Sequence, residues 1–118
     1  MSLAAHHVVG LALAAMGLIA LWRPALVWRP FGGTPATVDL RNEVRAVYGG
    51  FGLAVGALLM ASGVWPALAA GVRLALSVAL LGMAAGRLVG FAVERAGPWP
   101  WCFAALEALA GAALWFEA

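Results

Sequence analysis

The sequence predicts an all-α membrane protein, folded as an antiparallel bundle of four transmembrane helices. Four apolar stretches, each about long enough to cross a bilayer, fill nearly all of the 118-residue chain. Hydrophobic residues make up 65% of the chain and charged residues 10%, and the mean hydropathy is +0.99. A soluble fold cannot bury that much apolar surface, and backbone groups in lipid must pair internally, which favours helices. We therefore expect a single domain over residues 1–118.

The expected helices cover residues 3–22, 43–63, 67–93 and 101–116. The first has no Lys or Arg before it and no small-residue cleavage site after it, which favours a retained span over a cleaved signal peptide. The segment from Arg23 to Arg41 holds several Pro and Gly residues, so we expect a loop there. Asp39 is expected to cap the second helix.

The third expected helix carries an arginine near each end, Arg73 and Arg87. Each lies about two turns from the nearer end, so each guanidinium can reach toward an interface. A loop from Glu94 to Pro100 leads to the fourth helix, where Trp99, Trp101 and Trp115 fit interfacial belts.

The arginines predict the orientation. Six of the seven belong to the first and third loops, and only Arg73 lies near the second. Because positive residues stay in the cytoplasm, we expect an integral membrane protein with both termini on the non-cytoplasmic side. The arginines are scattered rather than grouped, which argues against nucleic acid as a partner.

The densest polar cluster opens the second helix. Arg41 and Arg45 share one helix face, as do Arg45 and Tyr48, and Glu43 lies among them. The same stripe continues through glycines that permit close approach of a backbone or ligand: Gly49, Gly52, Gly56 and Gly63. The alternative is that the glycines serve helix packing while the charges anchor lipid headgroups.

The third helix has its own glycine series, Gly82, Gly86 and Gly90, at four-residue spacing. Such spacing permits tight helix contact, and Ala104, Ala108 and Ala112 of the fourth helix offer a matching smooth surface. In a chain rich in Ala and Gly some of these patterns are accidental, but the series is long enough to predict packing.

Glu107 is the most unusual residue, because it lies about two turns inside an apolar helix. An unpaired charge in hydrocarbon costs at least ~2.5 kcal/mol on insertion scales, and Arg87 lies at similar depth on the neighbouring helix, so we expect the two to pair. A proton or substrate-ion site and a structural salt bridge both fit this pattern. Arg41, Glu43, Arg45, Tyr48, Arg87 and Glu107 together form the predicted ligand or ion-pair cluster.

Neither a metal nor another cofactor is expected. His6 and His7 are adjacent and therefore point to different sides of a helix, which favours interfacial placement over ligation. The lone Cys102 excludes an internal disulfide and any multi-cysteine metal site.

Two stretches carry a family resemblance: residues 42–50 (NEVRAVYGG) and residues 82–90 (GMAAGRLVG), with Gly97-Pro98 after them. Over most of its length the chain resembles the bacterial membrane-protein family called domain of unknown function 4345. Its members are compact four-helix proteins distantly similar to the DoxX-like group, which implies the same fold here but no activity. The family motif maps onto Arg45, Tyr48, Gly49, Gly50, Arg73, Gly86 and Arg87.

The sequence favours a non-enzymatic membrane module, acting as an accessory subunit or homo-oligomer. Its cytoplasmic-side cluster would bind a lipid, a small anion or a partner helix, since the chain has little room for a catalytic apparatus. Two other functions stay open. A proton-coupled transporter would use Glu107, and a quinone-linked redox helper is suggested by the DoxX-like similarity alone.

Overall fold

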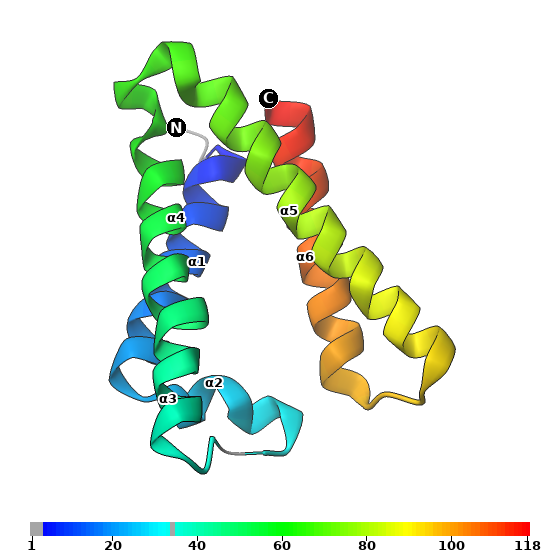
Figure 1. Cartoon of the computed structure of the whole chain (residues 1–118). Helices are drawn as coiled ribbons and strands as arrows, with labels where there is room; N and C mark the ends of the chain where they lie inside the picture. Colours follow the sequence, from blue (N-terminus) through cyan, green and yellow to red (C-terminus); the bar gives the residue numbers. More distant parts are fainter. Residues whose placement is uncertain (1–3, 34) are drawn as a thin grey trace. The chain divides into compact units, whose positions relative to one another are not determined.

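The computed structural model describes residues 4–33 and 35–118, and no strand occurs among them. Four helical segments in this part of the chain are long and apolar enough to cross a membrane: Ala5–Trp22 (α1), Val38–Val64, Pro66–Val93 (α5) and Pro98–Glu117 (α6) (Figure 1). The second consists of α3 (Val38–Val44), the π-helix η2 (Arg45–Gly50), α4 (Phe51–Ala61) and the 3₁₀-helix η3 (Ser62–Val64). The all-α fold with membrane-capable helices is therefore confirmed.

The chain divides into two compact units. Unit 1 contains His7–Ala61, and unit 2 contains Ser62–Ala118 together with the described residues up to His6. The antiparallel four-helix bundle and the single domain stay predictions.

Unit 1 is held together by glycines that bring two helix backbones into contact. A Cβ added to Gly10 would lie 2.8 Å from the Gly56 carbonyl oxygen, and one added to Gly56 would lie 2.6 Å from the Ala14 nitrogen. One added to Gly17 would lie 2.7 Å from the Gly49 oxygen. Membrane helices gain little from hydrophobic burial against one another, so such close van der Waals contact is a main source of their association.

The glycines of the second span thus have their partner within unit 1. A Cβ on Gly52 would lie 3.2 Å from the Leu13 oxygen, so Gly49, Gly52 and Gly56 all pack against α1. Gly63 has nothing within 4 Å and takes no part. Three of the four glycines in the predicted stripe thus lie in close contact, and the element they contact is α1.

The second span begins earlier than the sequence suggested. Its cap is Thr37, whose Oγ1 accepts a hydrogen bond from the Leu40 nitrogen at 3.1 Å. Asp39 lies inside the first turn, where its negative charge interacts favourably with the positive end of the helix dipole. The expectation that Asp39 caps the helix was wrong, because Thr37 is extended and in position to satisfy a free N–H.

The first loop is also more ordered than expected. It contains a short helix α2 (Pro24–Trp28) and a 3₁₀ turn η1 (Arg29–Phe31). Pro24 stands at the start of α2, where a helix needs no N–H, so the proline starts the helix instead of breaking it. Gly32 then ends the turn with a φ of +80°, a conformation that glycine adopts without strain.

Unit 2 is a helical hairpin of α5 and α6. The contacts run in opposite order along the two helices, because Phe91 stacks on Trp101 while Ser77 reaches Gly111. Ser77 Oγ donates a buried hydrogen bond of 2.6 Å to the Gly111 carbonyl. α6 begins at Pro98 rather than at residue 101, since Pro98 and Pro100 fall in the first turn, where their missing N–H groups cost nothing.

The glycine series of α5 does not contribute to this hairpin. Gly82, Gly86 and Gly90 are exposed, and a Cβ added to any of them would meet nothing within 4 Å. The close position is instead Gly111 of α6, where an added Cβ would lie 3.1 Å from the Ser77 carbonyl oxygen; Ala84 and Ala104 are buried. The expected partner, the alanine face of α6, is thus wrong, and a packing role for these glycines stays a prediction.

Candidate functional site

Unit 2 contains an ion pair between its two helices. Arg87 Nε donates to Glu107 Oε2 at 2.7 Å, and Nη2 donates to Oε1 at 2.8 Å. The Arg87 and Glu107 side chains are 26% and 10% exposed. Such a two-pronged, charge-assisted contact fixes both the spacing and the register of the helices that carry it. The predicted pairing of Arg87 with Glu107 is therefore present.

Aromatic rings lie beside this pair and one helix turn away from it. The Arg87 guanidinium lies 5.5 Å from the centre of the Phe103 ring, within cation–π range. One turn further along α5, Phe91 and Trp101 stack with ring centres 3.8 Å apart and planes 15° apart. The loop end of the hairpin is thus tied by one ion pair and one aromatic stack.

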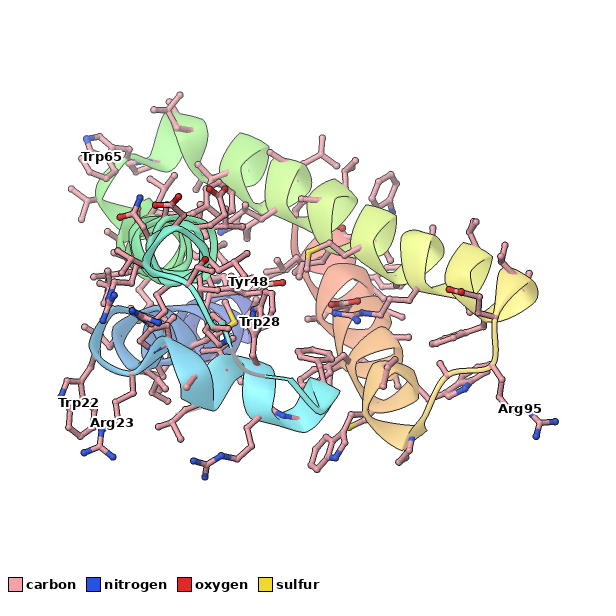
Figure 2. The ribbon with its side chains drawn as sticks, turned by 60° about the horizontal axis from the view of Figure 1, so that its bottom comes forward. Trp22, Arg23, Trp28, Tyr48, Trp65 and Arg95 are labelled. Atoms are coloured by element: carbon pink, nitrogen blue, oxygen red, sulfur yellow. The ribbon has the colours of Figure 1, made fainter. Side chains whose placement is uncertain are left out.

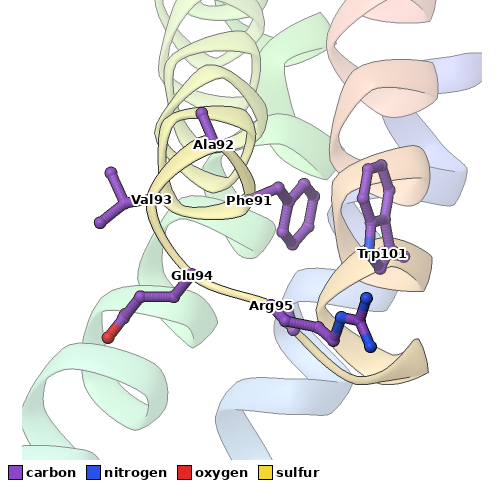
Figure 3. A pocket seen from close by; sticks show the side chains of 7 residues that line it. Phe91, Ala92, Val93, Glu94, Arg95 and Trp101 are labelled. Atoms are coloured by element: carbon purple, nitrogen blue, oxygen red, sulfur yellow. The ribbon is translucent and has the colours of Figure 1, made fainter.

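Beside the aromatic stack the surface is hollowed. A hollow of about 450 Å³ is lined by Phe91, Glu94, Arg95 and Trp101, among others (Figure 3). A neighbouring hollow of about 240 Å³ shares the first three of these residues and reaches Arg87. The sequence did not predict this hollow, and its only local signal is the Glu94-Arg95 pair between two spans.

The arginines that open the second span have backbone partners within unit 1. Arg45 Nε donates to the Leu21 carbonyl at 3.0 Å, so it satisfies one of the free carbonyls at the end of α1. Arg41 Nη1 donates to the Pro35 and Ala36 carbonyls, both at 3.3 Å. These contacts assign both arginines a structural task.

Arg45 and Tyr48 lie on a π-helix, which the sequence did not reveal. η2 spans Arg45–Gly50 and is continuous with the α-helices on either side. π-helical turns are rare and frequently occur at functional sites. Tyr48 is partly buried. The helix α2 contacts η2, and Figure 2 labels Tyr48 of η2 and Trp28 of α2. Glu43 is exposed.

The predicted cluster is thus divided between the units. Arg41, Glu43, Arg45 and Tyr48 belong to unit 1, whereas Arg87 and Glu107 belong to unit 2 and contact each other. A joint site of all six residues stays a prediction.

Unit 2 contains a second polar contact that the sequence analysis missed. His6 donates its backbone N–H to Glu117 Oε2 at 2.8 Å, and its Nδ1 lies 2.9 Å from Oε1. Interfacial placement was expected for His6, but its contact with a carboxylate was not, because the separation of 111 residues leaves no local signal.

Arg73 Nε is buried without a hydrogen-bond partner among the described residues.

Groups of three or more His, Cys, Asp or Glu side chains that could hold a metal ion do not occur among the described residues. Cys102 is exposed and unpaired there.

The model of the family described as Domain of unknown function (DUF4345) matches residues 3–117. The chain belongs to this family. Searches among curated proteins and among solved structures find no match for it.

Several residues of the expected DUF4345 motif have structural contacts here. Arg45 caps α1, Gly49 packs against Leu21, and Arg87 pairs with Glu107. Gly86 lies in open surroundings, and Arg73 Nε has no hydrogen-bond partner among the described residues.

Proposed function

We propose that this protein is an integral membrane module that binds another transmembrane helix along α5, as an accessory subunit or as a homo-oligomer. The observation that carries the proposal is a continuous face of small, exposed residues on a helix long enough to span a bilayer. We call it the small-residue face; it consists of Gly71, Ala75, Ala79, Gly82, Gly86 and Gly90.

The small-residue face lies on the side of α5 that is turned away from α6. An α-helix turns by about 100° per residue, which brings these six positions to the side opposite Ser77, Ala84 and Phe91. Those three residues face α6, since Ser77 bonds to Gly111, Ala84 is buried and Phe91 stacks on Trp101. The hairpin therefore uses one side of α5 and leaves the small side open.

Unit 1 shows what such positions do when a partner is present. There Gly10, Gly17 and Gly56 bring the backbones of two helices so close that an added Cβ would lie less than 3 Å from a backbone atom of the other helix. On α5 the same residue type, at similar spacing, has nothing within 4 Å. Small residues leave a groove that lipid tails fill poorly and a helix backbone fills well, so the open face favours a partner helix.

The ion pair supports the module over a transporter. Glu107 is engaged by two hydrogen bonds from Arg87, an arrangement that suits a fixed register between helices better than proton exchange. No specific observation favours the quinone-linked redox helper. As part of this proposal we assign the protein to the bacterial inner membrane, which the family resemblance implies, with both termini on the non-cytoplasmic side, which the arginine distribution predicts.

A matched pair of substitutions tests the proposal. Ala79→Leu fills the small-residue face, whereas Ala85→Leu adds the same side chain at an exposed position about 120° further round α5. The chain would be extracted from its host membrane into lipid nanodiscs and weighed by native mass spectrometry. We expect the wild type and Ala85→Leu to carry a second copy or a partner chain, and Ala79→Leu to lose it.

Two results contradict this function. One is a wild-type chain that is alone in nanodiscs. The other is equal assembly of the two variants, which would show that the small-residue face makes no contact with a partner.

A further inference from the structure

We propose that the hollow at the loop end of the α5–α6 hairpin binds the headgroup of a zwitterionic phospholipid, with the phosphate at Arg95 and the ammonium at Glu94. This site lies in the loop and the adjoining ends of the two helices, and it does not depend on the small-residue face.

The hollow has the size of a small-molecule site. It measures about 450 Å³, and ligand pockets are typically about 300–1,000 Å³. Phe91 and Trp101 form a stacked wall on one side, and the Glu94-Arg95 segment forms the rim (Figure 3).

Its available charges are one positive and one negative. Glu94 and Arg95 are exposed, and their side chains have no hydrogen-bond or ion-pair partner in the described part of the chain. Figure 3 shows the two side chains pointing to different sides, so they present their charges separately. Arg87, at the neighbouring hollow, is already neutralised by Glu107.

This charge pattern matches a phosphate joined to an ammonium group. A guanidinium donates paired hydrogen bonds to phosphate oxygens, and a carboxylate accepts from an ammonium. A purely anionic headgroup would gain from Arg95 but would be repelled by Glu94.

The position of the hollow favours a lipid over a free phosphate ion. Residues 94–97 lie between two membrane-capable helices, which end at Val93 and begin at Pro98. Trp99 and Trp101 are exposed beside them, as in the aromatic belts that lie at headgroup level. Figure 2 shows the Arg95 side chain extending away from the hairpin at this end. Phospholipid phosphates are abundant at this depth.

The test measures headgroup preference. The full-length chain would be purified in detergent and offered an equal mixture of phosphatidylethanolamine and phosphatidylglycerol with identical acyl chains. Native mass spectrometry then counts the retained lipid of each kind. We expect a preference of about fivefold for phosphatidylethanolamine, the size that one exposed charge contact typically supports.

Charge-removing variants separate this site from general lipid adhesion. Arg95→Gln should lower retention of both lipids. Glu94→Gln should turn the preference toward phosphatidylglycerol, because only the positive charge remains. Arg29→Gln removes an exposed arginine of unit 1 and should leave the preference unchanged.

Three results overturn the proposal: equal retention of the two lipids by the wild type, an unchanged preference in Glu94→Gln, or full retention in Arg95→Gln. A fourth arm adds inorganic phosphate. Displacement of the lipid by millimolar phosphate would mean that the hollow binds the free ion and not a lipid headgroup.

Discussion

Replacing Glu107 by leucine leaves the Arg87 guanidinium without its carboxylate inside a candidate membrane span. We expect this change to destabilise the hairpin strongly. Arg87→Leu should act in the same direction, since it leaves the Glu107 carboxylate unpaired. The double variant Arg87→Leu/Glu107→Leu should recover most of the lost stability, because neither charge then remains.

The geometry of the pair gives the magnitude. Losing one partner of a buried ion pair costs about 3–5 kcal/mol, whereas an exposed pair contributes about 0–1 kcal/mol. The Arg87 and Glu107 side chains are 26% and 10% exposed, and both hydrogen bonds are short, at 2.7 and 2.8 Å. We therefore expect each single variant to lose about 2–3 kcal/mol of unfolding free energy, a value between those two limits. The double variant should lose about 1 kcal/mol or less, because no unpaired charge remains.

The assay is reversible unfolding of the purified chain in mixed micelles with rising SDS, followed by tryptophan fluorescence. The four proteins of the cycle give a coupling energy, which we expect to be about 3 kcal/mol or more. Arg73→Leu is the control, because the buried Arg73 Nε has no hydrogen-bond partner among the described residues, and its loss should cost less than that of Arg87. A coupling energy below about 0.5 kcal/mol would refute the structural role of the pair.

Three further predictions use the same unfolding assay. Ser77→Ala removes a buried hydrogen bond of 2.6 Å and should cost about 1 kcal/mol; no change would mean that the bond adds nothing to the hairpin. Gly17→Ala forces a methyl group against a helix backbone and should destabilise unit 1 by about 1–3 kcal/mol. Gly50→Ala, where an added Cβ would meet only the Arg45 carbonyl oxygen at 3.8 Å, should cost less than Gly17→Ala, and equal effects of the two would contradict the packing. Thr37→Ala should cost about 1 kcal/mol and Asp39→Ala less, and the reverse order would make Asp39 the cap.

Much of the fold was predictable because lipid restricts the choices. Twenty apolar residues in hydrocarbon have to form a helix, so composition and length were enough to predict the four membrane-capable segments. The helix starts were less predictable. Thr37 and Asp39 are both good caps, and Pro24 and Pro98 serve equally well as breakers or as first residues.

The candidate site was predictable in part. An unpaired Glu107 inside an apolar helix is so costly that a cation at matching depth had to be its partner, and Arg87 was the one on the neighbouring helix. The stack of Phe91 on Trp101 and the hollow beside it were not predictable, because they depend on how the loop at residues 94–97 turns the two helix ends toward each other.

The sequence by itself determined that the chain forms apolar helices long enough to cross a membrane, and that Glu107 needs a partner, because both follow from the cost of polar groups in hydrocarbon. Only the tertiary structure decided which small-residue series are in contact. The stripes at Gly49–Gly56 and Gly82–Gly90 look alike in sequence, yet the first packs against α1 and the second faces away from α6. A glycine stripe permits close approach but does not specify its partner, because it has no side chains whose shape or charge could select one.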